Sequence, residues 1–243
     1  MRRRFFVEQF DGSSATLRGD AAEHLGRVLR AEPGQLYELS DGERVWLARV
    51  ESIGMLKRGE NRIEFSLVEP IATNGSKLRV TLFIALVKFD RFEWCLEKAT
   101  ELGVHSIQPI AAARSDKALV GAAEKRHARW EKILVESAQQ SRRLRPPALA
   151  AAISTEDAFS GAEAELKVLL SERADAAPLR NVLRGVTSNS VVIAIGPEGG
   201  WTDGELDFAR AKRFSEASLA NLILRTETAV LAALAIVNFA IGE

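Results

Sequence analysis

The stretches VVIAIGPEGGWTDGEL (residues 191–206) and LANLILRTETAVLAALA (residues 219–235) decide the fold of this chain. Each reads as an extended segment, then a turn, then the start of a helix. The β-branched run at 191–195 is typical of a parallel strand that is buried on both faces. The glycine-rich turn at 196–200 lets a ligand approach the main chain closely. Together the two stretches predict a ligand site made of loop backbone at one edge of an α/β sheet.

Both stretches also carry signals for the start of a helix. Thr202 followed by Glu205 fits a capping box. Thr226 and Glu227 supply a cap residue and a carboxylate at the start of a long apolar helix, where the helix dipole favours both. Capping, together with an ion pair between Arg225 and Glu227, is a sufficient structural explanation of this segment. A functional role for it stays open on these grounds alone.

The composition is that of an ordinary soluble globular protein. The 243 residues carry a formal net charge of zero, so any surface that binds nucleic acid must be local. A single cysteine, Cys95, excludes an intrachain disulfide and fits a reducing cytosol. The three histidines are scattered, which predicts no metal site. The chain shows no signal peptide and no apolar run long enough to span a bilayer, so we expect a cytoplasmic protein without a membrane partner.

The pattern of strands and helices changes near residue 72. Residues 1–72 alternate short strands and turns around one helix at 21–30, which Asp20 is expected to cap, and predict a small, mostly β barrel. Residues 73–243 alternate strands with helices, which predicts a parallel sheet covered by helices on both faces. The second region is expected to contain strands at 78–87, 104–110, 166–172 and 191–196 and near 218, and helices at 89–103 and 124–141, from 178, from 203 and at the end of the chain.

Several common enzyme motifs are missing from the sequence. There is no GxGxxG or GxxxxGK[ST] for a nucleotide and no GxSxG for a hydrolase. Cys95 lies inside an apolar helix pattern, which indicates a packed thiol and not a nucleophile.

Basic residues gather at 2–4, 27–30, 125–129 and 142–145. Each group fits either a solvated face or a contact with RNA.

Five segments of the chain occur in the order typical of one family: HLGRVLR (24–30), KATELGV (98–104), RWEKILVESAQQSRR (129–143), IGPEGG (195–200) and LILRTETA (222–229). On these segments, which span nearly the whole chain, it resembles the ribosomal RNA small-subunit methyltransferase E family. That family belongs to the SPOUT class of S-adenosylmethionine-dependent enzymes and methylates N3 of a uridine in 16S rRNA.

The resemblance implies a two-domain architecture and an assembly. Residues 1–72 would form a PUA-like RNA-binding β-barrel. Residues 73–243 would form a SPOUT methyltransferase domain whose parallel sheet contains a deep trefoil knot. The protein would be a homodimer with its site near the subunit interface, would act on 16S rRNA or the 30S subunit, and would need no metal.

The resemblance also implies the residues of the site. Three loops, matching 169–172, 195–200 and 219–228, would hold S-adenosylmethionine mostly through backbone groups. The implied cofactor-binding residues are Leu169, Leu170, Ser171, Glu172, Ile195, Gly196, Pro197, Gly199, Gly200, Leu219, Leu224, Thr226 and Thr228. The candidate RNA-binding residues are Arg2, Arg4, Arg27, Arg30, Arg114 and Arg143.

The third of these loops departs from the family pattern LGxRILR at two positions. Ala220 replaces a glycine, so we expect its backbone to be less free to take positive φ. Leu222 replaces an arginine, which removes one possible contact to a phosphate or to the cofactor.

The chemistry of uridine methylation assigns the candidate catalytic residues. N3 is protonated at neutral pH and must lose its proton before it attacks a methyl group. Arg225 is expected to stabilise the uracil anion or orient the base, while Glu227 or Glu198 shapes the local field or accepts the proton. Two alternatives stay open. One is a ribose 2′-O methyltransferase of the same superfamily, and the other is a non-catalytic RNA-binding or ribosome-assembly protein.

Overall fold

The computed structural model describes residues 3–55, 61–73 and 77–242. The chain divides into two compact units, one made of residues 1–75 with 138–146 and the other of residues 76–137 with 147–243. The segment 138–146 joins the first unit through side-chain bonds to its backbone. Arg4 Nη1 donates to the Arg142 carbonyl (2.6 Å), and Ser40 Oγ donates to the Leu144 carbonyl (2.6 Å).

The first unit is built on a six-stranded sheet in the order β1-β4-β5-β6-β3-β2. All neighbouring strands are antiparallel except β1 and β4. Alternating apolar side chains such as Phe5, Leu17 and Ile63 are fully buried against one another. The strands are β1 (Arg4–Phe6), β2 (Phe10–Asp11), β3 (Ser14–Arg18), β4 (Leu36–Ser40), β5 (Val45–Met55) and β6 (Asn61–Ile71).

The helix predicted at 21–30 forms as two short pieces, α1 (Gly19–Glu23) and the π-helix η1 (His24–Val28). Asp20 does not cap it. The N-cap position belongs to Arg18, which makes no side-chain cap bond, and Asp20 lies in the first turn. The N-cap lies two residues earlier than expected because Gly19 takes φ +61° and turns the chain directly out of β3.

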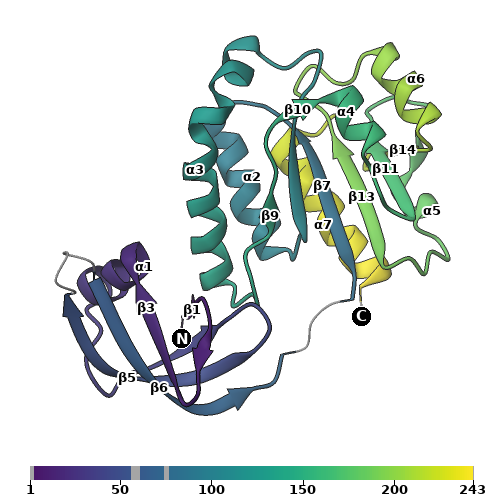
Figure 1. Ribbon diagram of the computed structural model, residues 1–243. Coiled ribbons are helices and arrows are strands. Elements are labelled where there is room, and N and C mark those ends of the chain that lie inside the picture. The colour runs from purple at the N-terminus through teal and green to yellow at the C-terminus, as the bar shows by residue number, and fades with distance from the viewer. Residues whose placement is uncertain (1–2, 56–60, 74–76, 243) are drawn as a thin grey trace. The chain divides into compact units, whose positions relative to one another are not determined.

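The second unit contains a parallel sheet in the order β10-β8-β7-β13-β11-β14-β12, with β9 also paired to β8 (Figure 1). The predicted parallel sheet is therefore confirmed. Its strands are β7 (Arg79–Ala85), β8 (Ser106–Ala111), β9 (Ala148–Leu149), β10 (Ile153–Ser154), β11 (Leu166–Leu170), β12 (Ala177–Pro178), β13 (Ser190–Ile195) and β14 (Ser215–Ser218).

Helices cover both faces of this sheet (Figure 1). Phe92, Trp130 and Val230, from α2, α3 and α7, are buried on one face, while Phe159 and Leu206, from α4 and α6, are buried on the other. The helices are α2 (Phe89–Glu101), α3 (Lys117–Gln140), α4 (Thr155–Ser160), α5 (Leu179–Val182), α6 (Asp203–Ala211) and α7 (Thr226–Ile241). None of the helices in the described parts of the chain has the length and apolarity needed to cross a membrane.

The helix α3 begins earlier than the predicted residue 124. Asp116 accepts a hydrogen bond from the Ala118 N–H through its carboxylate (2.8 Å). The Asp116 carbonyl accepts the bond from Val120 N–H that opens the helix (3.0 Å). An aspartate in this position is a favoured helix start, so the sequence held a signal that the apolar pattern alone did not reveal.

Glu205 is a buried carboxylate that joins three elements of the second unit. It is 5% exposed and forms the predicted capping box with Thr202 at the start of α6. Its Oε1 also accepts from the Ala113 N–H (3.0 Å) and from the Thr155 hydroxyl (2.8 Å). Burial alone would raise the pKa of Glu205, but the hydrogen bonds from Thr202, Ala113 and Thr155 together outweigh it and lower the pKa.

Replacing Glu205 by glutamine tests this arrangement. Because the folded-state pKa is depressed, the carboxylate stabilises the fold at neutral pH. That contribution is lost as the pH falls from about 4.3, the pKa of a glutamate in the unfolded chain, through the lower pKa of Glu205 in the folded state. We expect Glu205→Gln to lower the free energy of unfolding by about 2 kcal/mol at neutral pH, and by much less in acid. Urea denaturation at both pH values measures the difference.

The exposed Glu163, which makes no side-chain bond within the described residues, offers a matched control. Glu163→Gln should change the unfolding free energy by less than about 0.5 kcal/mol. An equal destabilisation by Glu205→Gln at neutral and acid pH would show that the charge of Glu205 is not the stabilising feature.

Candidate functional site

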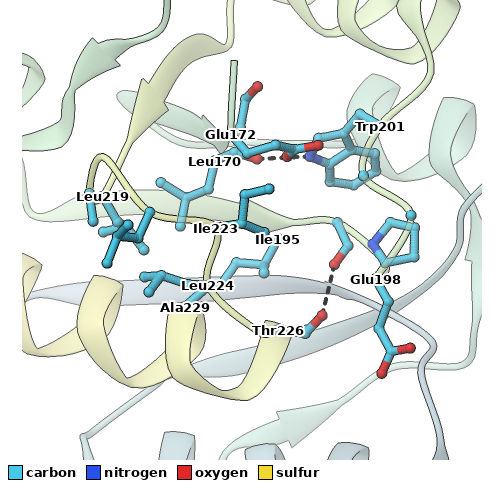
Figure 2. A pocket seen from close by; sticks show the side chains of 17 residues that line it. Leu170, Glu172, Ile195, Glu198, Trp201, Leu219, Ile223, Leu224, Thr226 and Ala229 are labelled. Atoms are coloured by element: carbon cyan, nitrogen blue, oxygen red, sulfur yellow. Dashed lines mark hydrogen bonds between the residues drawn. The ribbon is translucent and has the colours of Figure 1, made fainter. Parts of the chain in front are cut away.

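A pocket lies at the carboxyl ends of β11, β13 and β14, where three loops meet (Figure 2). Because these strands are parallel, the loops that follow them lie at the same edge of the sheet, which is where α/β folds usually bind ligands. The pocket is lined by Leu170, Ser171, Glu172, Ile195, Gly196, Pro197, Glu198, Gly199, Gly200, Trp201, Leu219, Ala220, Leu222, Ile223, Leu224, Thr226 and Ala229.

Trp201 holds the middle loop against the end of β11. Its indole N–H donates to the Leu170 carbonyl (3.0 Å), as Figure 2 shows, and its side chain is buried. A Cβ added to Gly196 would lie 3.0 Å from the indole ring, which is a tight contact. A larger residue at position 196 would therefore have to displace the indole by a few tenths of an ångström.

Gly200 completes the turn of the same loop. Its φ is +70°, a conformation that side chains rarely adopt, and a Cβ there would collide with the Glu172 carboxylate. Glu172 follows β11, so this close approach brings the first and second loops together at the pocket. Exposed backbone on one side and a carboxylate on the other form this part of the wall.

The third loop joins the second through Thr226. The N-cap residue of α7 is Arg225, which makes no side-chain cap bond, so the prediction that Thr226 caps this helix is wrong. Thr226 is the first residue of α7, and its hydroxyl donates to the Gly196 carbonyl (3.3 Å). The hydroxyl finds a partner in the neighbouring loop because α7 begins directly beside it (Figure 2).

The departures at residues 220 and 222 leave the loop intact. Ala220 is not among the described residues with positive φ, so alanine fits its backbone without strain. Leu222 and Ile223 line the pocket with side chains that are 78% and 84% exposed. The rim of the pocket is therefore apolar where the family pattern would place an arginine.

Two of the candidate catalytic residues differ in their surroundings. Glu198 lines the pocket and forms an ion pair with Arg91 of α2. Glu227 lies on α7, and its Oε2 is buried without a hydrogen-bond partner in the described parts of the chain. Glu198 is thus neutralised by a cation, whereas Glu227, which is not among the residues that line the pocket, has a buried oxygen without a donor.

Arg225 is exposed, and its side chain makes no ion pair or hydrogen bond within residues 3–55, 61–73 and 77–242. The ion pair between Arg225 and Glu227 that the sequence allowed is therefore not formed there.

Near Glu227 lies Cys95, which is fully buried in α2. Burial, and secondarily the charge of Glu227, raise the pKa of the Cys95 thiol to about 12. At neutral pH this thiol is not a nucleophile.

The chemistry of the pocket suits a ligand with an apolar part and a positive centre. Ile195, Leu224 and Ala229 form an apolar wall, and the glycine-rich loop presents backbone groups. Glu172 and Glu198 place two carboxylates at the same pocket. Glu198 is paired with Arg91, so Glu172 is the carboxylate that leaves negative charge at the pocket. No group of three or more His, Cys, Asp or Glu in the described regions could hold a metal ion.

The pocket brings together most of the predicted cofactor-binding residues. Leu169 and Thr228 lie outside it: Leu169 is buried on the opposite face of the sheet with Phe159, and Thr228 is exposed on α7. The pocket also includes Trp201 and Ala229, which lie outside the three predicted loops. Trp201 follows the glycine turn directly, and a large aromatic residue beside two glycines was the available signal.

The candidate RNA-binding arginines are placed very differently in the first unit. Arg2 lies outside the described residues. Arg4 is buried and pairs with Glu38 (2.9 Å), so its guanidinium serves the fold. Arg27 is exposed, although it pairs with Glu23 (2.7 Å), and Arg30 is exposed with φ +51°.

The last two candidate arginines lie further along the chain. Arg143 is half-buried, and burial lowers the pKa of its guanidinium. Arg114 donates hydrogen bonds to backbone carbonyls of the pocket loop. Among the described candidates, Arg27, Arg30 and Arg114 are exposed, and Arg27 and Arg30 lie on one short segment.

Comparison with known proteins identifies the family. Residues 74–238 match the RNA methyltransferase domain family. Ribosomal RNA small subunit methyltransferase E of Synechocystis sp. is 35% identical over 95% of this chain and 75% of that protein. The Aquifex aeolicus protein of the same name is 28% identical over 97% of this chain and 99% of its own length.

Solved structures show the same likeness. The crystal structure of a ribosomal RNA small subunit methyltransferase E from Neisseria gonorrhoeae bound to S-adenosyl methionine has a TM-score of 0.87 and 32% identity, and the match covers 100% of this chain and 99% of that one. The match in sequence and the match in structure agree over nearly the entire length. This chain belongs to the ribosomal RNA small subunit methyltransferase E family, with an RNA methyltransferase domain at residues 74–238.

Proposed function

We propose that this protein transfers the methyl group of S-adenosylmethionine to N3 of a specific uridine in the 16S rRNA of the small ribosomal subunit. The observation that carries the proposal is the pocket formed by three loops at the carboxyl end of the parallel sheet. It combines a glycine-rich backbone cradle with an apolar wall and two carboxylates. The related Neisseria gonorrhoeae protein binds S-adenosylmethionine. A pocket with these three features suits that ligand.

The residues of the pocket fit this cofactor by their chemistry. Bound S-adenosylmethionine supplies an electrophilic methyl group on a positively charged sulfur. Ile195, Leu224 and Ala229 offer apolar contact for its aromatic base. The Glu172 carboxylate would attract a bound cation, and the loop at 196–200 offers backbone hydrogen bonds.

Removal of the N3 proton is the step for which the protein must supply a base. Glu227 suits this role because one of its carboxylate oxygens has no partner in the described structure. Glu198 suits it less because Arg91 neutralises its charge. Arg225 would stabilise the negative charge that develops on the uracil ring. Since Cys95 is a buried thiol with a raised pKa, methylation at carbon through a cysteine adduct is disfavoured.

We further propose a SPOUT-type domain over residues 73–243 with a deep trefoil knot, and a PUA-like RNA-binding barrel over residues 1–72. The path of α7 supports the knot. After β14, which lies beyond β11 in the sheet, the chain returns and α7 contacts β13 and α2. A chain that re-enters the centre of its own domain in this way meets the main requirement for threading a loop.

A homodimer in the cytoplasm is the proposed working form. On α7, Thr228, Ala235 and Phe239 are exposed at helical spacing, and Phe239 is 93% exposed. A second copy of the chain would cover this face through a symmetric contact. Because α7 begins at the pocket, the site would then lie close to the partner subunit.

The product distinguishes this function from its alternatives. The purified protein is incubated with S-adenosylmethionine and either 30S subunits or naked 16S rRNA, and the modified nucleotide is mapped by mass spectrometry. We expect one methyl group on N3 of a uridine. A methyl group on a ribose 2′-oxygen would establish the rival transferase, and binding of rRNA without any methylation would establish a non-catalytic protein.

Arg225→Ala tests the stabilisation of the uracil anion. Loss of a group that stabilises charge in the transition state typically lowers kcat about 100-fold. We expect a fall of this size with little change in the Kd of S-adenosylmethionine, and partial recovery in Arg225→Lys. Arg225 would have no role in the chemistry if Arg225→Ala methylated unmodified 16S rRNA at the wild-type rate.

Glu227→Gln and Glu198→Gln separate the two candidate bases. A positioned general base contributes about 100-fold or more to the rate. We therefore expect Glu227→Gln to lower kcat by at least that factor, and Glu198→Gln by less than about tenfold. Single-turnover methylation measures both rates, with Glu163→Gln as the control for an exposed carboxylate. A larger loss of rate in Glu198→Gln than in Glu227→Gln would instead identify Glu198 as the general base.

A further inference from the structure

We infer that Arg114 is a positioning residue that holds the middle loop of the pocket, residues 196–202, in its ligand-binding shape from outside the pocket. Its contacts go to the backbone of that loop, although the sequence grouped Arg114 with the candidate RNA-binding arginines. The inference rests on the proposed binding of S-adenosylmethionine in this pocket.

One nitrogen of Arg114 bridges two carbonyls of the loop. Its Nη1 donates to the Gly199 carbonyl (2.7 Å) and to the Trp201 carbonyl (3.3 Å). These two carbonyls flank Gly200, the residue with φ +70°. The guanidinium therefore fixes the turn at the point where the backbone is most free to change conformation.

The arm of Arg114 also packs against the loop. A Cβ added to Gly199 would lie 3.3 Å from the Arg114 Cδ, so the glycine leaves room for the methylene groups to pass. Arg114 itself does not line the pocket. It supports the loop from the outer side, while the inner side stays open to a ligand.

The segment that carries Arg114 is itself anchored. The Ala113 N–H donates to the buried Glu205 carboxylate (3.0 Å), and the Ser115 hydroxyl donates to the Leu86 carbonyl (3.1 Å). Glu205 also caps α6, the helix that begins directly after the loop. Arg114 and the start of α6 are thus tied to one carboxylate, and the loop between them has little freedom to shift.

This arrangement predicts an effect on cofactor affinity rather than on RNA affinity. Without the two hydrogen bonds, the turn at Gly199 and Gly200 would sample several conformations, and binding would have to order it. Loss of hydrogen bonds from a charged donor of this kind corresponds to a rise of about tenfold in the Kd of the cofactor. The Nη1 of this exposed guanidinium is engaged by two loop carbonyls, so loss of its hydrogen bonds acts first on the loop.

Arg114→Met is the informative variant because it keeps the methylene groups beside Gly199 and removes the hydrogen bonds. Arg184→Met is its matched control, since Arg184 is exposed on the same unit and makes no side-chain bond in the described structure. Calorimetry with S-adenosylmethionine and filter binding with 16S rRNA measure the two affinities of the full chain. We expect the Kd of S-adenosylmethionine to rise about tenfold in Arg114→Met, with the rRNA affinity and the Tm equal to those of Arg184→Met.

Two further variants keep the outcomes distinct. Arg114→Lys retains one donor and should recover part of the affinity, which a general loss of folding would not allow. Leu224→Arg places a cation in the pocket itself and should weaken S-adenosylmethionine binding strongly. If Leu224→Arg has no effect, the proposed cofactor site is wrong. If Leu224→Arg weakens binding but Arg114→Met does not, or if Arg114→Met weakens only rRNA binding, the positioning role is overturned.

Discussion

The buried carboxylate of Glu205 is the interaction on which the geometry of the site depends. It accepts hydrogen bonds from the turn after β8, from α4 and from Thr202, the N-cap residue of its own helix, α6. A carboxylate in this position would be costly if its oxygens were unpaired. With both oxygens bonded, it fixes α6, and therefore the end of the loop at 196–202, relative to the sheet. The other constraints on the loop act within this frame.

Those other constraints explain the glycines of the loop. Gly196 lies against the Trp201 ring, Gly199 against the Arg114 side chain and Gly200 against the Glu172 carboxylate. Trp201 belongs to the loop itself, whereas Arg114 follows β8 and Glu172 follows β11, and together they restrain the loop backbone. A loop restrained in this way presents its N–H and carbonyl groups at fixed positions, which lowers the entropy that a ligand must remove on binding.

The sequence revealed those features whose partners are close along the chain. The buried strand at 191–195 and the capping box of Thr202 and Glu205 were both predictable, because periodicity and caps are local patterns. The partner of Thr226 was not, because the Gly196 carbonyl lies 30 residues away. Arg114 shows the same limit. A single arginine in a turn gives no sign that its partners are the carbonyls of Gly199 and Trp201.

The two glutamates near the pocket show how surroundings assign different roles to the same side chain. Glu198 lies on the glycine loop, and its ion pair with Arg91 joins that loop to α2. The Arg91 guanidinium occupies one Glu198 oxygen, so this carboxylate already has a partner at the edge of the pocket. Glu227 has no such cation among the described residues, and one of its oxygens is buried without a donor. A buried carboxylate oxygen without a donor leaves an acceptor at the start of α7, and this difference from Glu198 is the basis of the role proposed for Glu227.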